Sequence, residues 1–398
     1  LLRDAKNSNW IRKLKNQLGF VPKISGKVIW LHCVSVGEFN AAKPLIDKIF
    51  IKFPLHQIVI STTTITGSEA VEKHYKSQVI HCFFPFDIPF IVSSFLKKIK
   101  PVACILLETE IWPNLITKLK HKNIPVMLVN ARLSKKSFKK YNKFSPKLVS
   151  STLNSLSIIC SQNESSSKRF ISLGANNNII TTGSLKFDSN EPSNSKTIQT
   201  LKNITGDRRI VVFASTRKGE ELQIIKSYLA LKSKFNALLL IVPRHPERFN
   251  EVFNMANETG LNVKRRSLAG HCEQDTDILI GDSMGEMMSY LNISDIAFIG
   301  GSLTNNGGQN MLEAASLSKP IIFGPSVFNF EEISKRLLDD GSAIQVSNAE
   351  ELMKTISELL LDDEKRRLIG ESAKTTFENN RGATTKIFKA IAPYIKDI

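Results

Sequence analysis

The stretch "VIWLHCVSVGEFNAAKPLIDKIF", residues 28–50, contains an apolar run, one glycine and an amphipathic run, in that order. The apolar run at 28–36 predicts a buried strand, and "AAKPLIDKIF" at 41–50 predicts a helix. We expect the chain to turn at Gly37, which gives the strand–turn–helix entry of an α/β unit. Glu38 then lies at the helix start, where the helix dipole favours its ionised form. On these local grounds a helix-start acid is the plainest interpretation of Glu38.

The same alternation recurs along the chain. Short apolar runs at 57–62, 102–107, 125–130 and 157–160 are each followed by a helical pattern, and it resumes after a polar segment at 186–209. We therefore predict an α/β fold of two doubly wound parallel sheets facing one another across a cleft. The expected N-terminal domain covers 1–190, a linker 191–207 and the C-terminal domain 208–398, with the last helix packing back on the N-terminal domain. Ligands are expected beyond the carboxyl ends of the strands.

Composition limits the class of protein. The chain has 398 residues, 42% of them hydrophobic and 23% charged, which indicates a folded, soluble protein with more than one core. Its formal net charge of +17 favours nucleic acid, anionic lipid or phosphorylated ligands. The five scattered cysteines lack CxxC spacing and are expected to be reduced core residues in a cytosolic compartment. No apolar run is long enough to span a bilayer.

Two loops of the second half carry candidate phosphate ligands. "IVPRHPERF" places Arg244 and His245 directly after a strand, where a guanidinium can hold a phosphate bidentately. In "ILIGDSMGEMMSYL", the residues 283–286 open a helix whose free N–H groups suit an anion. A helix cap is the alternative interpretation of the second loop.

A third loop is rich in glycine. "FIGGSLTNNGGQNMLEAASLSKPIIFGP" has four glycines, at 300, 301, 307 and 308, before a helix expected to begin near Gln309. Such a turn predicts a nest for a charged leaving group. Glu313 lies one turn into that helix, where its carboxylate can accept hydrogen bonds from ribose hydroxyls.

The first half holds further carboxylates and a basic run. Glu108 and Glu110 end a strand two residues apart, so both point to one side if the strand continues. The run 132–147, "RLSKKSFKKYNKFSPK", interleaves lysines with aromatic residues, which fits a solvated face, a helix on anionic lipid or a nucleic-acid groove. The "DTD" at 275–277 resembles a metal-binding pair of carboxylates, but it precedes a strand, and we expect no metal there.

Nine short motifs now fall into a known order: "SVGE", "TTTITGSE", "ETEIWPN", "NARLS", "TGSLKFD", "ASTRKGEE", "PRHPERF", "GDSMGE" and "GGQNMLEAA". In this order the chain closely resembles the 3-deoxy-D-manno-octulosonic acid (Kdo) transferases, which modify the lipid A precursor of Gram-negative bacteria. The resemblance implies two Rossmann-like domains of the GT-B glycosyltransferase architecture. It also implies an enzyme that needs neither metal nor cofactor, takes CMP-Kdo as donor and lipid IVA as acceptor, and works in lipopolysaccharide biosynthesis.

The resemblance further implies roles for individual residues. Glu38 would be the general base, and Glu108 or Glu110 together with Lys186 would support the reacting centre. The CMP ligands implied by the family motifs are Pro243, Arg244, Met284, Gly285, Glu286, Asn310, Met311, Leu312 and Glu313. Three positions depart from the family pattern: Arg217 and Gln309 replace common histidines, and Ala314 replaces a proline.

The family also implies a location and partners. We expect an anionic membrane surface at the cytoplasmic face of the inner membrane, an N-terminal anchor upstream of this sequence, and no nucleic acid. Two alternatives remain open. One is a nucleotide-sugar epimerase with the same two domains, and the other is a basic module that binds RNA or a lipid surface.

Overall fold

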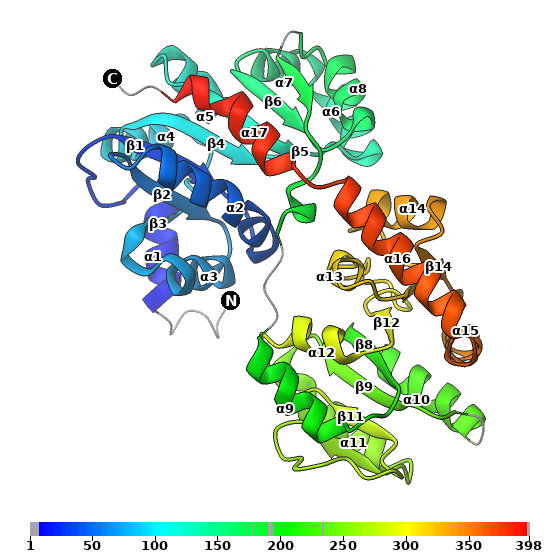
Figure 1. Ribbon diagram of the computed structural model, residues 1–398. Helices are drawn as coiled ribbons and strands as arrows, with labels where there is room; N and C mark the ends of the chain where they lie inside the picture. The colour runs from blue at the N-terminus through cyan, green and yellow to red at the C-terminus, as the bar shows by residue number, and fades with distance from the viewer. Residues whose placement is uncertain (1–7, 177, 190–193, 233–234, 396–398) are drawn as a thin grey trace. The chain divides into compact units, whose positions relative to one another are not determined.

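The computed structural model describes residues 8–176, 178–189, 194–232 and 235–395 (Figure 1). The chain divides into two compact units. The first comprises Leu1–Ser189 and Asn380–Ile398, and the second comprises Asn190–Asn379. The chain therefore leaves the first unit once and returns to it with its last helix. The segment expected as a linker contains the helix α9 (Ser195–Thr205) of the second unit.

The first unit is built on a seven-stranded sheet in the order β3-β2-β1-β4-β5-β6-β7, with every described strand pair parallel. Its strands are β1 (Val28–His32), β2 (Gln57–Thr62), β3 (Ile80–Phe83), β4 (Pro101–Leu107), β5 (Val126–Ala131), β6 (Ile158–Ser161) and β7 (Ile179–Thr181). Its helices are α1 (Ser8–Gln17), α2 (Val36–Lys52), α3 (Ile65–Tyr75), α4 (Pro89–Ile99), α5 (Pro113–His121), α6 (Lys135–Phe144), α7 (Pro146–Leu153), α8 (Glu164–Ser172) and α17 (Ala383–Ile391).

The second unit repeats this plan with the order β10-β11-β9-β8-β12-β13-β14, again with parallel pairs. Its strands are β8 (Ile210–Thr216), β9 (Leu238–Pro243), β10 (Val263–Arg265), β11 (Ile278–Ile280), β12 (Ile296–Ile299), β13 (Ile321–Phe323) and β14 (Ala343–Gln345). Besides α9, its helices are α10 (Glu220–Leu231), α11 (Phe249–Asn257), α12 (Met287–Ile293), α13 (Leu312–Ser316), α14 (Glu331–Asp339), α15 (Ala349–Leu361) and α16 (Asp363–Asn379).

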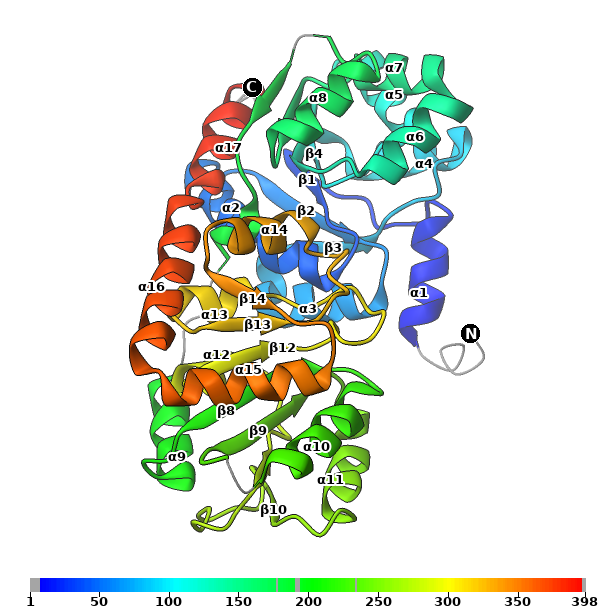
Figure 2. The same ribbon diagram turned by 90° about the vertical axis from the view of Figure 1, so that its right-hand side faces the viewer.

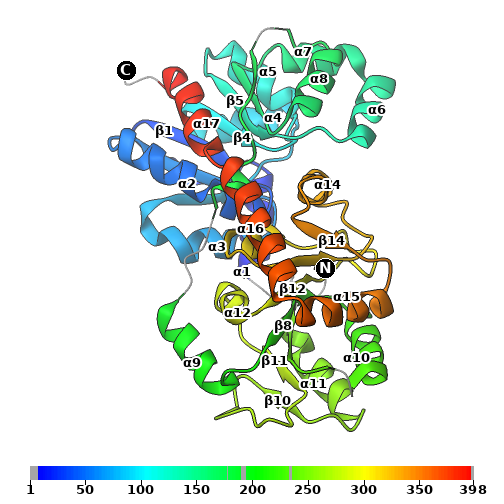
Figure 3. The same ribbon diagram turned by 45° about the vertical axis from the view of Figure 1, so that its right-hand side comes forward.

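Both sheets are covered by helices on their two faces, which explains why the central strands β4, β9 and β12 consist of apolar, almost entirely buried residues. In β1 the alternate residues Val28 and Trp30 belong to one buried cluster, whereas Ile29 and Leu31 belong to another. In the second unit, residues of α10, α11 and α15 form one buried cluster with the strands (Figure 2). Helices α9 and α12 lie on the opposite side of this sheet (Figure 3). The predicted pair of doubly wound α/β domains is confirmed.

The turn after β1 differs from the expectation. The strand ends at His32, and α2 begins at Val36, with Ser35 as its N-cap residue. Gly37 therefore lies inside the first helical turn, and the prediction that the chain turns at this glycine was wrong. The Glu38 carboxylate closes the turn instead, because its Oε2 accepts the Val34 N–H at 2.7 Å.

The last helix is attached to the first unit through Asp188. Its two carboxylate oxygens accept the N–H groups of Gly382, at 2.7 Å, and Thr384, at 2.6 Å, at the start of α17. Asp188 directly follows the short helix η2 (Leu185–Phe187), which carries Lys186. One carboxylate thus joins the segment that presents Lys186 to the returning chain.

We expect Asp188→Ala to destabilise the start of α17 by about 1–2 kcal/mol, as loss of a helix cap does. Hydrogen exchange should then be faster at the amides of Gly382 and Thr384 and through α17. Asp188→Asn keeps one acceptor oxygen and should show a smaller change. Equal exchange in Asp188→Ala and the unaltered chain would contradict the capping role.

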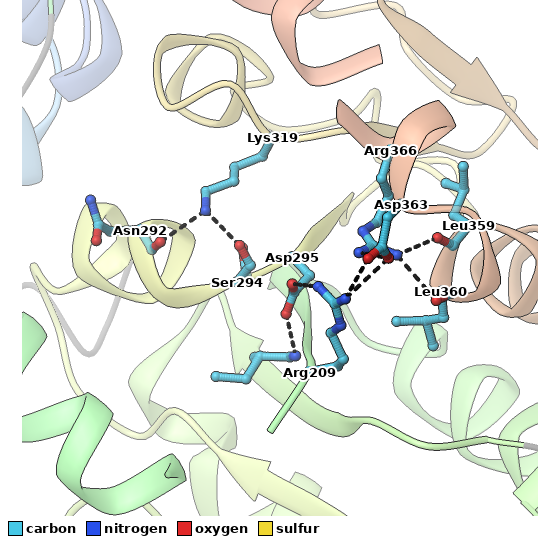
Figure 4. Close-up of polar contacts among 10 residues, drawn as sticks. Arg209, Asn292, Ser294, Asp295, Lys319, Leu359, Leu360, Asp363 and Arg366 are labelled. Atoms are coloured by element: carbon cyan, nitrogen blue, oxygen red, sulfur yellow. Dashed lines mark hydrogen bonds and ion pairs between the residues drawn. The ribbon is translucent and has the colours of Figure 1, made fainter. Parts of the chain in front are cut away.

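A polar network lies at the amino ends of β8 and β12 (Figure 4). Arg209 donates to Asp295 at 2.9 Å and to Asp363, the first residue of α16, at 3.0 Å. Lys319 donates to the carbonyl oxygens of Asn292 and Ser294. Because the Arg209 and Asp363 side chains are 44% and 70% exposed, this ion pair contributes little stability.

In the described part of the chain, no helix has the length and apolarity to cross a membrane.

Candidate active site

Three carboxylates gather at the carboxyl ends of two neighbouring strands in the first unit. Strands β1 and β4 pair directly, so the loops that follow them begin side by side. Glu38 follows β1, and Glu108 and Glu110 follow β4. The charges of Glu108 and Glu110 both act on Glu38, which shows that the structure brings these three predicted residues together.

The surroundings of Glu38 change its acidity strongly. Partial burial, followed by repulsion from Glu108, raises the pKa of Glu38 to about 8, although the Val34 N–H and the charge of Lys186 oppose the shift. The helix dipole was expected to keep this carboxylate ionised. That expectation was wrong, because the free energy needed to remove the charged carboxylate from water exceeds its favourable interaction with the helix dipole. Glu38 therefore gains and loses its proton close to neutral pH.

The backbone leaves the strand conformation directly before Glu108 and Glu110. The strand ends at Leu107, and Glu108 adopts the left-handed conformation with φ 58°. A residue with a side chain seldom takes this conformation, and such strain tends to occur at functional sites. The Lys186 ammonium lies 4.0 Å from Glu108 Oε1. Glu108 is thus an acid within ion-pair distance of Lys186.

Glu110 is held by two residues that the sequence analysis did not single out. Trp112 Nε1 donates to Glu110 Oε2 at 2.7 Å, and His32 Nε2 lies 3.5 Å from the same oxygen. The His32 ring is fully buried, and its Nδ1 lies 3.0 Å from the Ser61 carbonyl oxygen. A histidine inside the apolar run "VIWLHC" was the only sequence signal for this contact.

In the second unit, positive groups cluster after β8 and β9. The Arg244 N–H donates to the Thr216 carbonyl at 3.0 Å, which joins the two strand ends. The Arg217 guanidinium hydrogen-bonds His245 Nε2. Burial, and then the charge of Arg244, lowers the pKa of Arg217. Because these like charges repel one another, a bound anion would stabilise the arrangement.

The predicted loop at 283–286 does open a helix, because Glu286 is the N-cap residue of α12. Gly285 has a positive φ of 81°, and the Met284 side chain is 57% exposed. The Glu286 carboxylate accepts from Ser283 Oγ and pairs with Arg266 Nη2 at 2.9 Å. This carboxylate is therefore fixed in place.

The glycine-rich loop departs from its predicted role. The N–H groups of its glycines at 300, 301, 307 and 308 are all used inside the protein, by the Ala214 carbonyl, Glu220, Ser326 Oγ and the Gly301 carbonyl. These four N–H groups are therefore not available to a charged leaving group, and the expectation that they bind one was wrong. The helix α13 also begins at Leu312 and not near Gln309. Asn310 lies just before this start, where its Oδ1 accepts the Leu312 N–H and its Nδ2 donates to Glu313.

The basic run forms α6 with two different faces. Phe138 and Tyr141 pack against a buried cluster of the first unit, whereas Lys136, Lys139 and Lys140 are exposed. The side chain of Phe144 lies outside the described part of the chain. The described aromatic rings thus pack against the core, and the lysines provide the charged surface.

In the "DTD" motif, the Asp277 carboxylate accepts hydrogen bonds from Tyr228 and Lys232.

Two units, each with a parallel, doubly wound sheet, are the architecture of the GT-B fold. Residues 12–189 match the family model "3-Deoxy-D-manno-octulosonic-acid transferase (kdotransferase)", and residues 206–376 match "Glycosyl transferases group 1". The chain is 36% identical to a 3-deoxy-D-manno-octulosonic acid transferase of Haemophilus influenzae, covering 99% of this chain and 94% of the relative. The corresponding transferase of Bordetella pertussis is 31% identical, covering 92% and 87%. The chain belongs to the Kdo transferase family and is a Kdo transferase.

Solved structures with low sequence identity share the fold. A glycosyltransferase from Rickettsia africae is 14% identical with a TM-score of 0.62, covering 94% of this chain and 100% of that chain. A UDP-GlcNAc 2-epimerase from Neisseria meningitidis, bound to UDP-GlcNAc, is 14% identical with a TM-score of 0.62, covering 92% and 100%. The likeness to the epimerase therefore concerns the fold alone, and the transferase class rests on the sequence relatives.

Proposed function

We propose that this transferase moves Kdo from CMP-Kdo to the lipid A precursor lipid IVA, with Glu38 as the general base. The observation that carries the proposal is the position of Glu38 beside Glu108 and Glu110, where burial and then the charge of Glu108 raise its pKa to about 8. A base whose pKa lies near the working pH is basic enough to take a proton from a sugar hydroxyl and is still partly ionised.

In the proposed step, the Glu38 carboxylate removes the proton of the acceptor hydroxyl as its oxygen attacks the anomeric carbon of Kdo. The bond from that carbon to the phosphate oxygen breaks, and CMP leaves with the electron pair. Attack from the side opposite the leaving group inverts the configuration of the sugar. Lys186, beside Glu108, supplies positive charge to the reacting centre.

The donor is proposed to bind through the second unit. Arg244 lies near Arg217, whose guanidinium donates to His245 Nε2, and the two positive charges suit the phosphate of CMP. Glu313 and Glu286 carry carboxylates held by neighbours, which suits hydrogen bonds to the ribose. The proposed CMP ligands remain Pro243, Arg244, Met284, Gly285, Glu286, Asn310, Met311, Leu312 and Glu313.

The acceptor lipid is proposed to reach the enzyme at the cytoplasmic face of the inner membrane. The exposed lysines of α6 and the formal net charge of +17 favour an anionic lipid surface. Binding to vesicles that contain anionic lipid should therefore weaken as salt rises. Binding that does not depend on lipid charge would contradict this part of the proposal.

Mass spectrometry of lipid IVA after incubation with the protein and CMP-Kdo tests the whole proposal. The expected product is a more polar lipid that is heavier by one or more Kdo residues, accompanied by free CMP. A protein that alters the nucleotide sugar and leaves the lipid unchanged would be an epimerase. Salt-dependent binding of RNA without turnover would indicate a basic binding module.

The pH dependence of the rate tests the base. Because Glu38 must be ionised to accept a proton, the rate should fall about tenfold for each pH unit below about 8. Glu108→Gln removes the nearby charge that contributes most to the shift, so the acid limb should move to lower pH. Glu110→Gln should move it less, since its charge acts on Glu38 more weakly. An acid limb that stays in place in both variants would contradict the assignment.

A further inference from the structure

Two adjacent glutamates at the start of α10 have no part in the proposed chemistry. Glu220 and Glu221 are both 0% exposed. Burying a carboxylate is unfavourable unless hydrogen bonds or an opposite charge replace the lost water. Their contacts therefore show what these two carboxylates hold in place.

Glu220 joins the loops that follow β8 and β12. Its Oε2 accepts the N–H groups of Gly301, at 2.7 Å, and Arg217, at 2.8 Å. Its Oε1 accepts the N–H groups of Ser302, at 2.9 Å, and Leu303, at 2.8 Å. Burial raises the pKa of Glu220, and these backbone hydrogen bonds oppose that shift. The carboxylate thus occupies the anion nest that the glycine-rich loop forms.

The two loops meet closely at Gly300. A Cβ atom at this position would lie 2.6 Å from Thr216 Cα, so only glycine allows the approach. The Thr216 carbonyl in turn accepts the Arg244 N–H at 3.0 Å. The loop that carries Arg244 is therefore connected to the loops after β8 and β12.

Glu221 holds the Arg244 loop from its other end. Its carboxylate forms an ion pair with both terminal nitrogens of Arg248, one of them at 3.2 Å. Arg248 ends the short helix η4 (Pro246–Arg248) and also contacts Glu251 of α11 at 3.3 Å. The Arg248 side chain is only 10% exposed, so this pair is well protected from solvent.

We propose that Glu220 and Glu221 are positioning residues for the donor, which together hold the strand-end loops after β8, β9 and β12 in their binding arrangement. This inference rests on the proposed donor site in the second unit. A carboxylate can accept all four N–H groups at Glu220, because both of its oxygens have two acceptor sites. A glutamine has one acceptor oxygen, and its NH₂ group would face two N–H donors.

The test compares CMP binding by calorimetry with hydrogen exchange. In Glu220→Gln we expect the Kd for CMP to rise about ten- to a hundredfold, the size of effect that unsatisfied buried donors produce. The amides of Gly301, Ser302 and Leu303 should exchange faster. In Glu221→Gln the faster exchange should instead appear near Arg244 and Arg248, again with weaker CMP binding.

Asp277→Asn is the matched control for lost stability. Asp277 is a buried acid of the same unit, 5% exposed, which accepts from Tyr228, Lys232 and the Asn262 N–H. It directly precedes β11 and so lies at the amino end of a strand, whereas the donor loops follow the carboxyl ends of β8, β9 and β12. We expect Asp277→Asn to lower the melting temperature while the Kd for CMP stays unchanged.

The outcomes separate the inference from the proposed donor site. If the unaltered protein binds CMP and Arg244→Ala weakens this binding, the donor site stands. The same Kd and the same exchange in Glu220→Gln as in the unaltered protein would then overturn the positioning role alone. Equal losses in Glu220→Gln and Asp277→Asn would also overturn it, since the effect would be general destabilisation. If Glu220→Gln does not fold, Glu220→Asp takes its place, because it keeps the charge but draws it back from the loops.

Discussion

Glu38→Gln is expected to lower the rate of Kdo transfer by a factor of about 10²–10⁴ while CMP still binds. Glutamine has nearly the same shape and keeps an oxygen that can accept the Val34 N–H, which Glu38 accepts at 2.7 Å. It has no basic group for the proton of the acceptor hydroxyl. The loss should therefore appear in kcat measured with saturating donor and acceptor, and the Kd for CMP from calorimetry should stay the same.

Glu164→Gln is the matched control. Glu164 is the first residue of α8 in the same unit and is exposed, so it represents an acid that only favours a helix start. Its replacement should leave the rate unchanged. Near-normal turnover in Glu38→Gln would reduce Glu38 to the same structural role and would remove the central step of the proposed mechanism.

Arg244→Ala is expected to raise the KM for CMP-Kdo about ten- to a hundredfold. Hydrogen bonds to charged groups contribute about 1.5–3 kcal/mol, and a phosphate held by a guanidinium loses both of its contacts in this variant. The exposed Arg244 side chain is available to a ligand, and its backbone bond to Thr216 remains in the variant. Initial rates over a range of donor concentrations measure the change.

Two other variants define the Arg244 contact. Arg244→Lys keeps the charge but cannot form the bidentate pair, so its KM should lie between those of the unaltered protein and Arg244→Ala. Arg367→Ala removes an exposed arginine that pairs with Glu371 on α16 and should leave the KM unchanged. An unchanged KM in Arg244→Ala would remove this residue from the donor site.

The fold class can be predicted from the amino-acid sequence alone. Residues 28–31 are apolar without a break because β1 is buried on both faces, and this pattern can be read from neighbouring residues alone. The ordered motifs likewise placed the chain in the Kdo transferase family, and they pointed to the loops at Glu38, Glu108 and Arg244. Local patterns and short motifs need no knowledge of contacts between distant segments.

The hydrogen bonds, ion pairs and pKa shifts of these residues follow from the tertiary structure. The pKa of Glu38 depends on its burial and on Glu108, which follows a different strand, and the Lys186 ammonium that lies 4.0 Å from Glu108 comes from a segment far along the chain. The glycine-rich loop predicts a site for an anionic ligand, whereas in the structure its N–H groups at Gly301 and Ser302 donate to the Glu220 carboxylate. Burial and electrostatic interaction depend on distances through space, so the order of residues along the chain does not specify them.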